Sequence, residues 1–359
     1  ALIAMSGGVD SSVAAYLMKE KGYDCIGCTM KLYDNEDAGI PRGHTCCSLD
    51  DIDDARSVAF RLQMPYYVFN FKDGFKEKVI DRFIAAYESG RTPNPCIDCN
   101  RFMKFERLYE RARILKCDII VTGHYARIER QQDMYVLKKA IDENKDQSYV
   151  LYSLTQEQMA HTVFPLGEMN KSETRKIAEE NGFINAAKPD SQDICFVPNG
   201  DYAEVIRKHT GKTYAEGDFV TAEGKVLGRH KGIINYTIGQ RKGLGISAAA
   251  PLYVCGLDTE NNRVILGNNE SLFSDTVYVA DMNWCSGASC DQPVRCSAKI
   301  RYRHKEQPAE VFPLKDGMIK IVFDEPQRAV TPGQAAVLYD GDMVLGGGTI
   351  ISKNDLHGI

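Results

Sequence analysis

The sequence predicts an α/β fold: a doubly wound, Rossmann-like parallel sheet, followed by a small linker domain and a C-terminal β-barrel. Up to about residue 200, short apolar runs alternate with segments of helical periodicity, and no hairpin signal separates them. This pattern is typical of parallel strands joined by helices. Beyond that point glycines become frequent and short apolar runs take over, as in all-β regions. We therefore expect three domains, at residues 1–200, 201–272 and 273–359.

The regular elements of the first domain follow from apolar spacing. Val13, Ala14 and Met18 fall on one face of a helix that Gly22 ends. Acids crowd the first turn of the helix expected at 50–62, and Asn170 with Glu173 forms a capping pair. The predicted strands are 1–5, 25–32, 66–71 and 118–122; further helices are expected at 74–89, from 101 onward and at 171–181.

The remaining segments give weaker expectations. Residues 91–100 are predicted to be a loop that two prolines keep extended. Residues 135–139 are expected to form a short excursion strand, and 190–196 a final loop and strand. In the all-β part, the strand candidates are 263–266, 276–279, 319–323 and 336–338.

Length and composition describe a globular protein without a membrane segment. The chain has 359 residues, of which 43% are apolar and 26% charged. No apolar run approaches the length of a membrane span, and no signal peptide is visible. We therefore expect a cytoplasmic protein with no membrane partner.

Charge is unevenly distributed along the chain. The net charge is −5, yet residues 225–245 and 295–305 each hold five Lys or Arg and no acid, whereas 34–54 holds seven acids and one Arg. Phosphate backbones are bound by local basic faces, whatever the net charge. The two basic segments therefore indicate an anionic partner, with a merely solvated face as the alternative.

Ser6–Ser12 is the strongest functional signal. It lies between a buried strand and a helix, where unpaired backbone N–H groups face an anion. Its glycines allow close approach and its three serines add hydroxyl donors, but no Gly-Lys-[Ser/Thr] follows, so it is not a Walker A loop. The stretch resembles the pyrophosphate loop of the ATP pyrophosphatases, which cleave ATP to adenylate a carbonyl oxygen. An ordinary strand-to-helix turn is the alternative.

The twelve cysteines are unevenly spaced, in a chain too large to need a disulfide framework. Cys96 and Cys99 form a C-x-x-C motif ahead of a predicted helix, whose dipole favours thiolate. This motif suits a redox pair, half a zinc site or a cluster ligand set. Cys195 is expected at the sheet edge that carries Ser6–Ser12, where pairing with Cys99 gives it a function. The others are expected to be structural: Cys25, Cys28, Cys46, Cys47, Cys117, Cys255, Cys285, Cys290 and Cys296.

Six segments together resemble the bacterial tRNA-specific 2-thiouridylases, in order along nearly the whole chain. They are Ser6–Ser12, Arg91–Asn100, Thr122–Arg127, Lys145–Leu151, Asp190–Phe196 and Tyr236–Ile246. That family replaces the 2-carbonyl oxygen of the wobble uridine by sulfur. The resemblance implies ATP-dependent adenylation of this oxygen and then sulfur transfer, giving 2-thiouridine, AMP and pyrophosphate. The implied partners are tRNA and a persulfide donor, a cysteine desulfurase or relay protein; Mg²⁺ is expected with ATP.

The resemblance also implies roles for individual residues. Cys195 would carry the persulfide and Cys99 would attack it, while Asp10 would either bind Mg²⁺ or support the loop. Asn94, Pro95 and Cys96 would hold the flipped base. The implied ATP site is Ala4, Met5, Ser6, Gly7, Gly8, Val9, Asp10, Ser11, Ser12, Met30 and Gly123. The further tRNA contacts are His124, Lys145, Asp146, Gln147, Arg301, Tyr302 and Gln334, with Arg241 and Lys242 on phosphate.

One position departs from the family, and several alternatives stay open. Several members carry Asp where this chain has Cys96. With the third thiol, Cys96, Cys99 and Cys195 could hold a [4Fe–4S] cluster with one iron open to hydrosulfide, in place of the persulfide route. Two other hypotheses are a ligase that adenylates a small molecule, and an RNA-binding or redox-sensing module whose nucleotide loop is structural.

Overall fold

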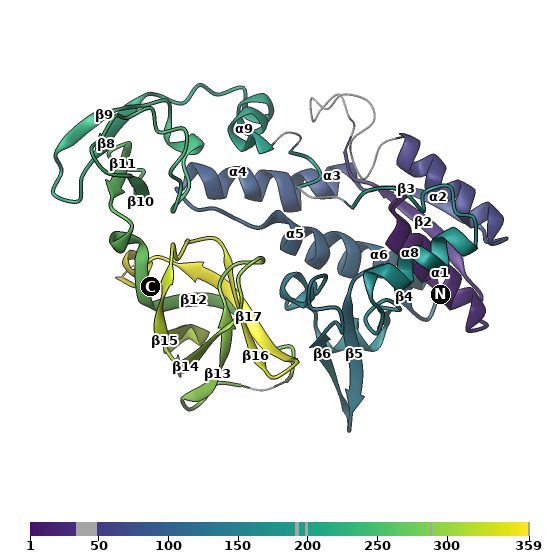
Figure 1. Cartoon of the computed structure of the whole chain (residues 1–359). Helices are drawn as coiled ribbons and strands as arrows, with labels where there is room; N and C mark the ends of the chain where they lie inside the picture. The colour runs from purple at the N-terminus through teal and green to yellow at the C-terminus, as the bar shows by residue number, and fades with distance from the viewer. Residues whose placement is uncertain (34–48, 191–193, 198–199, 288, 358–359) are drawn as a thin grey trace.

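The computed structural model describes residues 1–33, 49–190, 194–197, 200–287 and 289–357 (Figure 1). His44, Cys46 and Cys47 lie outside this part of the chain. No helix in the described residues is long and apolar enough to cross a membrane.

A five-stranded sheet organises the N-terminal part. Its strand order is β3-β2-β1-β4-β7, and every pairing is parallel. The order reverses between β1 and β4, so that the carboxyl ends of these strands open a crevice suited to a ligand. The predicted doubly wound sheet is confirmed, although β7 was not anticipated. The strands are β1 (Leu2–Ala4), β2 (Ile26–Lys31), β3 (Tyr66–Asn70), β4 (Ile120–Val121) and β7 (Thr162–Val163).

Helices cover both faces of this sheet. On one face, α1 (Val9–Glu20), α2 (Leu49–Arg61) and α8 (Lys171–Glu180) bury small and branched side chains against β1 and β4. On the other face, two long helices pack aromatic and apolar side chains against Leu2, Cys28 and Ile120. One consists of α3 (Lys72–Phe75), η1 (Lys76–Ile80) and α4 (Asp81–Glu88); the other of α5 (Pro95–Asp98), η2 (Cys99–Arg107) and α6 (Leu108–Ile114).

The expectation of an extended loop through residue 100 is wrong, because a helix begins at Pro95. Proline suits the first helical position, where its missing N–H has no partner to lose. Asn94 caps the helix: its Oδ1 accepts from the Cys96 N–H at 3.1 Å. Cys96 and Cys99 therefore lie within the start of the helix and not ahead of it.

Two further local predictions are wrong, and one strand was missed. Ile194–Val197 forms a turn and no strand. The excursion strand expected at 135–139 is confirmed as β6 (Met134–Lys139), but its hairpin partner β5 (Ala126–Gln131) was missed because the turn has no glycine; Gln132 adopts φ +54° instead. The part beyond residue 200 is not all-β, since α9 (Tyr202–Thr210) leads into it. Remaining short helices of the first part include η3 (Ser148–Leu151) and α7 (Gln156–Ala160).

A four-stranded sheet of order β10-β11-β8-β9 forms the middle of the chain. It consists of β8 (Gly217–Val220), β9 (Val226–His230), β10 (Tyr253–Asp258) and β11 (Arg263–Gly267), with η5 (Ile233–Asn235) between β9 and β10. Phe219, Tyr236, Val254 and Val264 build its core. This small core includes Tyr236, which belongs to the segment 234–240 that lines the cavity described below.

Six strands at the C-terminal end close into a barrel, as predicted. β12 pairs with both β15 and β17, which completes the ring. β17 also pairs with β6, so the β5–β6 hairpin from the first part extends the barrel's sheet (Figure 1). The strands are β12 (Phe273–Asn283), β13 (Val294–Lys299), β14 (Gln307–Pro313), β15 (Ile319–Arg328), β16 (Ala335–Asp340) and β17 (Met343–Ile351).

Candidate functional site

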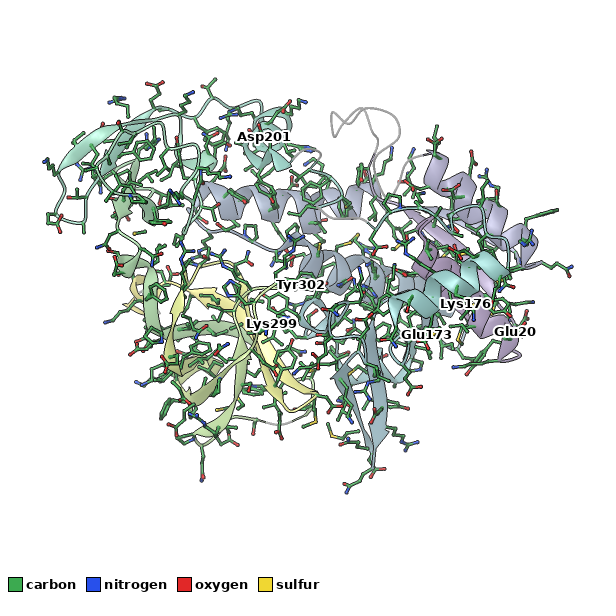
Figure 2. The ribbon with its side chains drawn as sticks, viewed as in Figure 1. Glu20, Glu173, Lys176, Asp201, Lys299 and Tyr302 are labelled. Carbon is green, nitrogen blue, oxygen red and sulfur yellow. The ribbon has the colours of Figure 1, made fainter. Side chains whose placement is uncertain are left out.

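A cavity of about 1340 Å³ lies where the edge of the parallel sheet, the segments 200–203 and 234–240, and the barrel meet. Figure 2 labels two lining residues, Asp201 before α9 and Tyr302 in the barrel. The predicted residues that line it are Ala4, Met5, Ser6, Asp10, Ser11, Met30, Asn94, Pro95, Cys96, Cys99, Gly123, His124, Gln147, Cys195, Arg301, Tyr302 and Gln334. Those that do not are Gly7, Gly8, Val9, Ser12, Lys145, Asp146, Arg241 and Lys242.

The Ser6–Ser12 loop is closed by its own hydroxyl groups. Ser11 Oγ and Ser12 Oγ both donate to the Gly8 carbonyl, at 3.0 and 3.1 Å, and Ser11 Oγ accepts from the Ser6 N–H at 3.2 Å. Two of the three expected hydroxyl donors are thus used inside the loop. No side chain caps α1, so the backbone N–H groups of its first turn remain the anion-binding feature.

Two glycines allow this loop to be approached closely. Gly7 has φ +73°, and a Cβ there would stand 2.3 Å from the Asp51 carbonyl oxygen. A Cβ on Gly123 would stand 2.7 Å from the Ser11 nitrogen. Gly123 therefore lets the end of β4 pack directly against the start of α1.

Asn185 and Lys188 support the loop from behind and were not anticipated. Asn185 Nδ2 donates to the Gly7 carbonyl and to Ser12 Oγ, both at 2.9 Å. Lys188 Nζ donates to the Gly7 carbonyl at 3.2 Å and pairs with Asp51 at 2.6 Å and Asp54 at 2.7 Å. Burial alone would lower the Lys188 pKa, but its hydrogen bonds to the two carboxylates raise it. The acids of the first α2 turn thus anchor a lysine as well as meeting the helix dipole.

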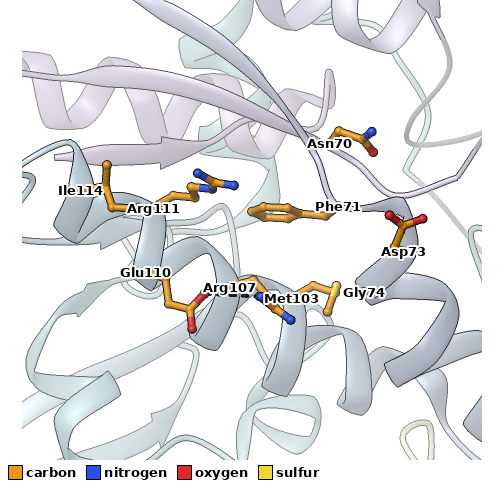
Figure 3. Close-up of a pocket in the computed structure, with 9 residues that line it drawn as sticks. All are labelled: Asn70, Phe71, Asp73, Gly74, Met103, Arg107, Glu110, Arg111 and Ile114. Carbon is orange, nitrogen blue, oxygen red and sulfur yellow. Dashed lines mark ion pairs between the residues drawn. The ribbon is translucent and has the colours of Figure 1, made fainter.

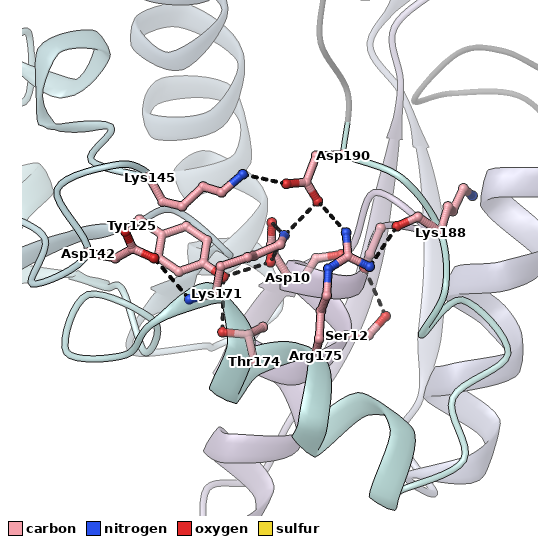
Figure 4. Close-up of polar contacts among 12 residues, drawn as sticks. Asp10, Ser12, Tyr125, Asp142, Lys145, Lys171, Thr174, Arg175, Lys188 and Asp190 are labelled. Atoms are coloured by element: carbon pink, nitrogen blue, oxygen red, sulfur yellow. Dashed lines mark hydrogen bonds and ion pairs between the residues drawn. The ribbon is translucent and has the colours of Figure 1, made fainter.

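A charged network joins the loop to the segment before Cys195 (Figure 4). Lys171 Nζ donates to both Asp10 oxygens, at 2.6 and 2.8 Å, and to Asp190 Oδ1 at 2.8 Å. Asp190 also accepts from Lys145 at 2.8 Å and Arg175 at 3.1 Å. Burial would raise the Asp190 pKa, but the hydrogen bonds from Lys145 and Lys171 outweigh it and lower the pKa to about 2. Asp190 is therefore a fixed anion at physiological pH.

The same network answers the question of Asp10 and Mg²⁺. Both Asp10 oxygens accept from Lys171, and Oδ1 also accepts from the Tyr125 hydroxyl at 2.9 Å. A carboxylate held this way does not fit a metal-ligand role and supports the loop's geometry instead. Within the described ranges, no group of three or more His, Cys, Asp or Glu side chains could hold a metal ion. The [4Fe–4S] cluster on Cys96, Cys99 and Cys195 therefore stays a hypothesis without support from this arrangement.

The barrel holds the segment that leads to the C-x-x-C motif. Gln334 Nε2 donates to the Thr92 carbonyl at 2.7 Å, and the Thr92 N–H donates to the Pro332 carbonyl at 2.9 Å. Cys96 is exposed and Cys99 is half-buried. Gln334, expected to contact tRNA, therefore has a structural contact that fixes the start of the cysteine-bearing helix.

Cys195 is anchored through its neighbours. The buried Tyr33 hydroxyl donates to the Cys195 carbonyl at 2.7 Å. Phe196 packs edge-on against Phe75 and Phe83, with ring centroids 5.7 and 5.3 Å apart. Cys99 and Cys195 pack against the same hydrophobic cluster and line the same cavity. The fold thus places in one cavity two cysteines that lie 96 positions apart in the sequence.

His124 is buried and neutral. Its Nδ1 lies 2.6 Å from Thr122 Oγ1, and its Nε2 lies 3.2 Å from Lys104 Nζ. A lysine ammonium only donates, so Nε2 accepts and Nδ1 carries the proton toward Thr122. Burial, and then the Lys104 charge, lower the His124 pKa well below its usual range. Lys104, which also lines the cavity, gave no signal in the sequence.

The predicted tRNA contacts at 145–147 are all engaged within the protein. Gln147 exchanges two hydrogen bonds with the Tyr125 backbone, at 2.8 and 2.9 Å. Asp146 accepts from the Ala140 N–H at 3.0 Å and the Ser148 hydroxyl at 2.8 Å. Together with the Lys145–Asp190 pair, these contacts shape the turn before η3, and any RNA contact would be additional.

Arg301 and Tyr302 form the barrel's side of the cavity. Arg301 Nη2 donates to the Ala329 carbonyl at 2.9 Å and to the Ile238 carbonyl of the middle part at 3.3 Å. Lys299 Nζ lies 5.7 Å from the Tyr149 ring centroid and 5.8 Å from that of Tyr302. Burial, followed by the negative charges of Asp146 and Cys96, raises the Tyr302 pKa. These contacts tie the barrel to both other parts at the cavity wall.

A second, smaller cavity of about 360 Å³ contains none of the predicted residues (Figure 3). It lies between the end of β3 and the η2–α6 helix, and an Arg107–Glu110 ion pair of 3.7 Å borders it. Its lining residues are Asn70, Phe71, Asp73, Gly74, Met103, Arg107, Glu110, Arg111 and Ile114.

Three family descriptions match consecutive parts of the chain. Residues 1–199 match the tRNA methyl transferase HUP domain, and residues 203–268 the tRNA methyl transferase PRC-barrel domain. Residues 274–350 match the aminomethyltransferase beta-barrel domain. The first of these alone covers more than half of the chain.

Curated proteins of similar length and sequence carry one name, tRNA-specific 2-thiouridylase MnmA. The protein from Clostridioides difficile (strain 630) is 52% identical over 351 residues, covering 97% of each chain. That from Thermoanaerobacter sp. (strain X514), MnmA 1, is 51% identical over 355 residues, covering 98% of each. That from Acetivibrio thermocellus is 50% identical over 353 residues, covering 97% of this chain and 98% of the relative. On this likeness over its full length, the chain belongs to the tRNA-specific 2-thiouridylase family.

Proposed function

We propose that this chain catalyses the ATP-dependent 2-thiolation of the wobble uridine of tRNA, giving 2-thiouridine, AMP and pyrophosphate. The observation that carries the proposal is that Ser6, Cys99 and Cys195 all line the same cavity, the one of about 1340 Å³. An ATP loop alone would serve many reactions, and two thiols alone would serve redox chemistry. Their meeting in one cavity supports a sulfur transfer that ATP drives.

The first step is adenylation of the base. The uridine O2 attacks the α-phosphorus of ATP and pyrophosphate leaves, which turns a poor leaving group into AMP. The loop and the uncapped start of α1 hold the departing anion, since backbone N–H groups and the helix dipole both favour negative charge there. ATP is expected to arrive with its own Mg²⁺, which would neutralise part of the charge on the phosphates.

The second step is sulfur transfer. A donor persulfide passes its terminal sulfur to the Cys195 thiolate and leaves as a thiol. The Cys99 thiolate attacks the Cys195 sulfur, which forms a Cys99–Cys195 disulfide and expels hydrosulfide. Hydrosulfide attacks C2, and AMP leaves with the former carbonyl oxygen. An external dithiol reduces the disulfide by two electrons and restores both thiols.

The partners of this reaction follow from its chemistry. The tRNA phosphates suit the basic segments 225–245 and 295–305, and the flipped base suits the cavity wall at Asn94, Pro95 and Cys96. The sulfur donor is a cysteine desulfurase or a relay protein. We place the reaction in the cytoplasm, where thiol reductants are present. The division at 1–200, 201–272 and 273–359 likewise stays a proposal.

Mass analysis of tRNA tests the function. The protein, ATP, a persulfide donor and unmodified tRNA are expected to yield 2-thiouridine at the wobble position, with Cys99→Ser and Cys195→Ser both inactive. Cys117→Ser is the matched control, since Cys117 does not line the cavity, and it is expected to keep full activity. Full activity of Cys99→Ser would overturn the proposed sulfur route.

Two companion measurements separate the alternatives. Pyrophosphate release that ignores tRNA would favour a small-molecule ligase, and none at all would favour a binding module. Stoichiometric iron after anaerobic reconstitution would favour the [4Fe–4S] route over the persulfide route, and we expect none.

A further inference from the structure

Asn100 is a buried amide that the proposed mechanism does not use. Its side chain is 2% exposed, and Nδ2 donates to the Val150 carbonyl at 2.9 Å. Its Oδ1 has no hydrogen-bond partner in the structure. A buried carbonyl oxygen left without a donor destabilises the fold, so its persistence needs a reason.

The orientation of this amide is fixed by its neighbour. The Val150 carbonyl can only accept, so the NH₂ end of Asn100 must face it, and a flipped amide would set two acceptors together. The unpartnered atom is therefore the oxygen, a neutral acceptor. Asn100 lies in the π-helical segment η2 (Cys99–Arg107), a distortion that often accompanies functional sites.

The cavity distinguishes Asn100 from other buried amides. Asn185 also has an unpartnered Oδ1 and is 3% exposed, but it does not line the cavity. Within the described part of the chain, the residues that line the cavity and have such an atom are Asn100, with an acceptor, and Arg301, with a donor. The acceptor follows directly after Cys99. Oδ1 itself is fully buried, so a ligand in the cavity would reach it once neighbouring side chains move, and would then present one N–H donor to it.

Uracil can supply such an N–H donor. Its N3–H lies next to C2, the carbon that the reaction attacks, whereas cytosine presents an N3 lone pair at the same place. We propose that Asn100 Oδ1 accepts the N3–H of the target uridine and so selects uridine over cytidine. The inference rests on the proposed function and deepens it: it assigns the residue that reads the base.

The test is a double-mutant cycle in which one change is made in the enzyme, at Asn100, and the other in the wobble base of the tRNA. Full-length tRNAs carry uridine, 3-methyluridine or cytidine at the wobble position, and tRNA-dependent pyrophosphate release is measured in single turnover. Asn100→Leu, which keeps the volume but removes the acceptor, and Asn100→Ala are compared with the unmodified chain. We expect the uridine rate to fall about 10- to 100-fold in both variants, from the loss of a buried hydrogen bond, while the cytidine rate does not fall.

The methylated base supplies the decisive comparison. In the parent enzyme, a tRNA with 3-methyluridine lacks the N3–H and so loses the same hydrogen bond that Asn100→Ala removes. The rate reductions caused by the methyl group and by Asn100→Ala are therefore not expected to multiply when Asn100→Ala acts on the 3-methyluridine tRNA. Asn185→Ala is the matched control, and it is expected to lower the rate of pyrophosphate release by the same factor with the uridine tRNA and with the cytidine tRNA. Melting temperatures and ATP affinity of each variant report on folding.

Failures of the two proposals can be told apart. If the unmodified chain releases no pyrophosphate with the uridine tRNA, the proposed function is overturned and this inference with it. If it does, but Asn100→Leu and Asn100→Ala slow uridine and cytidine equally or the two losses multiply, only the role of Asn100 is overturned. Asn100 would then serve to hold Val150.

Discussion

At the scale of single residues, the cavity depends on polar groups whose charges are held by their neighbours. Lys171 is 11% exposed at its side chain and lies between Asp10 and Asp190. In Figure 4 it pairs both with Asp10 of the Ser6–Ser12 loop and with Asp190 of the segment leading to Cys195. Replacing it leaves Asp10 without its cation, whereas Asp190 keeps its ion pairs with Lys145 and Arg175.

Lys171→Met is expected to lower pyrophosphate release about 10- to 100-fold and to destabilise the fold by about 1–3 kcal/mol, since removing one partner of a partly buried ion pair leaves an uncompensated charge. Denaturant titration and single-turnover kinetics check this. Lys176→Met is the matched control on the same helix. Its side chain is 74% exposed and forms an ion pair with Glu180 at 3.8 Å. A Lys171→Met variant with unchanged kinetics would contradict the role of the network.

His124 gives a pH prediction. Its pKa is lowered by burial and by Lys104, so the unfolded chain binds a proton more readily than the folded one. The stability that the neutral ring contributes is complete above the ordinary pKa of about 6.5 and is lost as the pH falls below it, by up to ~1.4 kcal/mol per pH unit.

Urea unfolding at pH 7.5 and pH 5.5 measures this slope. The parent is expected to lose more stability between the two pH values than His124→Asn, which has no titrating ring. His230 and His304, whose pKa values burial also lowers, remain in both proteins and cancel in the difference. Equal slopes would show that His124 does not titrate in this way.

At the scale of elements, the barrel controls the start of the α5 helix. Gly333 has φ +92°, and a Cβ there would stand 3.0 Å from both the Arg91 Cβ and the Thr92 nitrogen. Gly333→Ala is therefore expected to push the 91–94 segment and slow tRNA thiolation at least about 10-fold, because misplacing a reacting group by ~1 Å is costly.

A second glycine, Gly341, provides a control that separates backbone strain at the substituted residue from displacement of the 91–94 segment. Gly341 also has a positive φ, +59°, but no atom lies within 4 Å of its Cβ position. Gly341→Ala is expected to cost about 1 kcal/mol of stability for its backbone conformation, with thiolation unchanged. Equal thiolation by the two variants would contradict the barrel's control of the cysteine-bearing helix.

The elements also show which features a sequence can predict. β1, the loop and α1 are contiguous, so local patterns were enough for Ser6–Ser12. The prolines at 93 and 95 were misinterpreted because Pro95 suits a first helical turn as well as an extended loop. Asn185 and Lys188 have no local signature: each acts through Gly7, which lies far away in the sequence.

At the scale of the whole molecule, function depends on the meeting of three parts. Gln334 holds Thr92, and Arg301 reaches Ile238, so the barrel contacts both other parts beside the cavity. The resemblance to the 2-thiouridylases indicated which distant residues meet, whereas the ion pairs and the closure of β12 onto β17 required the structure. The roles of the predicted tRNA contacts remain predictions.

The central claim is that ATP activates the O2 of the wobble uridine inside this cavity. A tRNA whose wobble uridine carries ¹⁸O at O2 tests it directly, by mass analysis of the AMP formed during thiolation. Because that oxygen attacks the α-phosphorus and leaves with AMP, the account predicts one ¹⁸O atom in the AMP for each 2-thiouridine made. Unlabelled AMP alongside 2-thiouridine would contradict adenylation of the base.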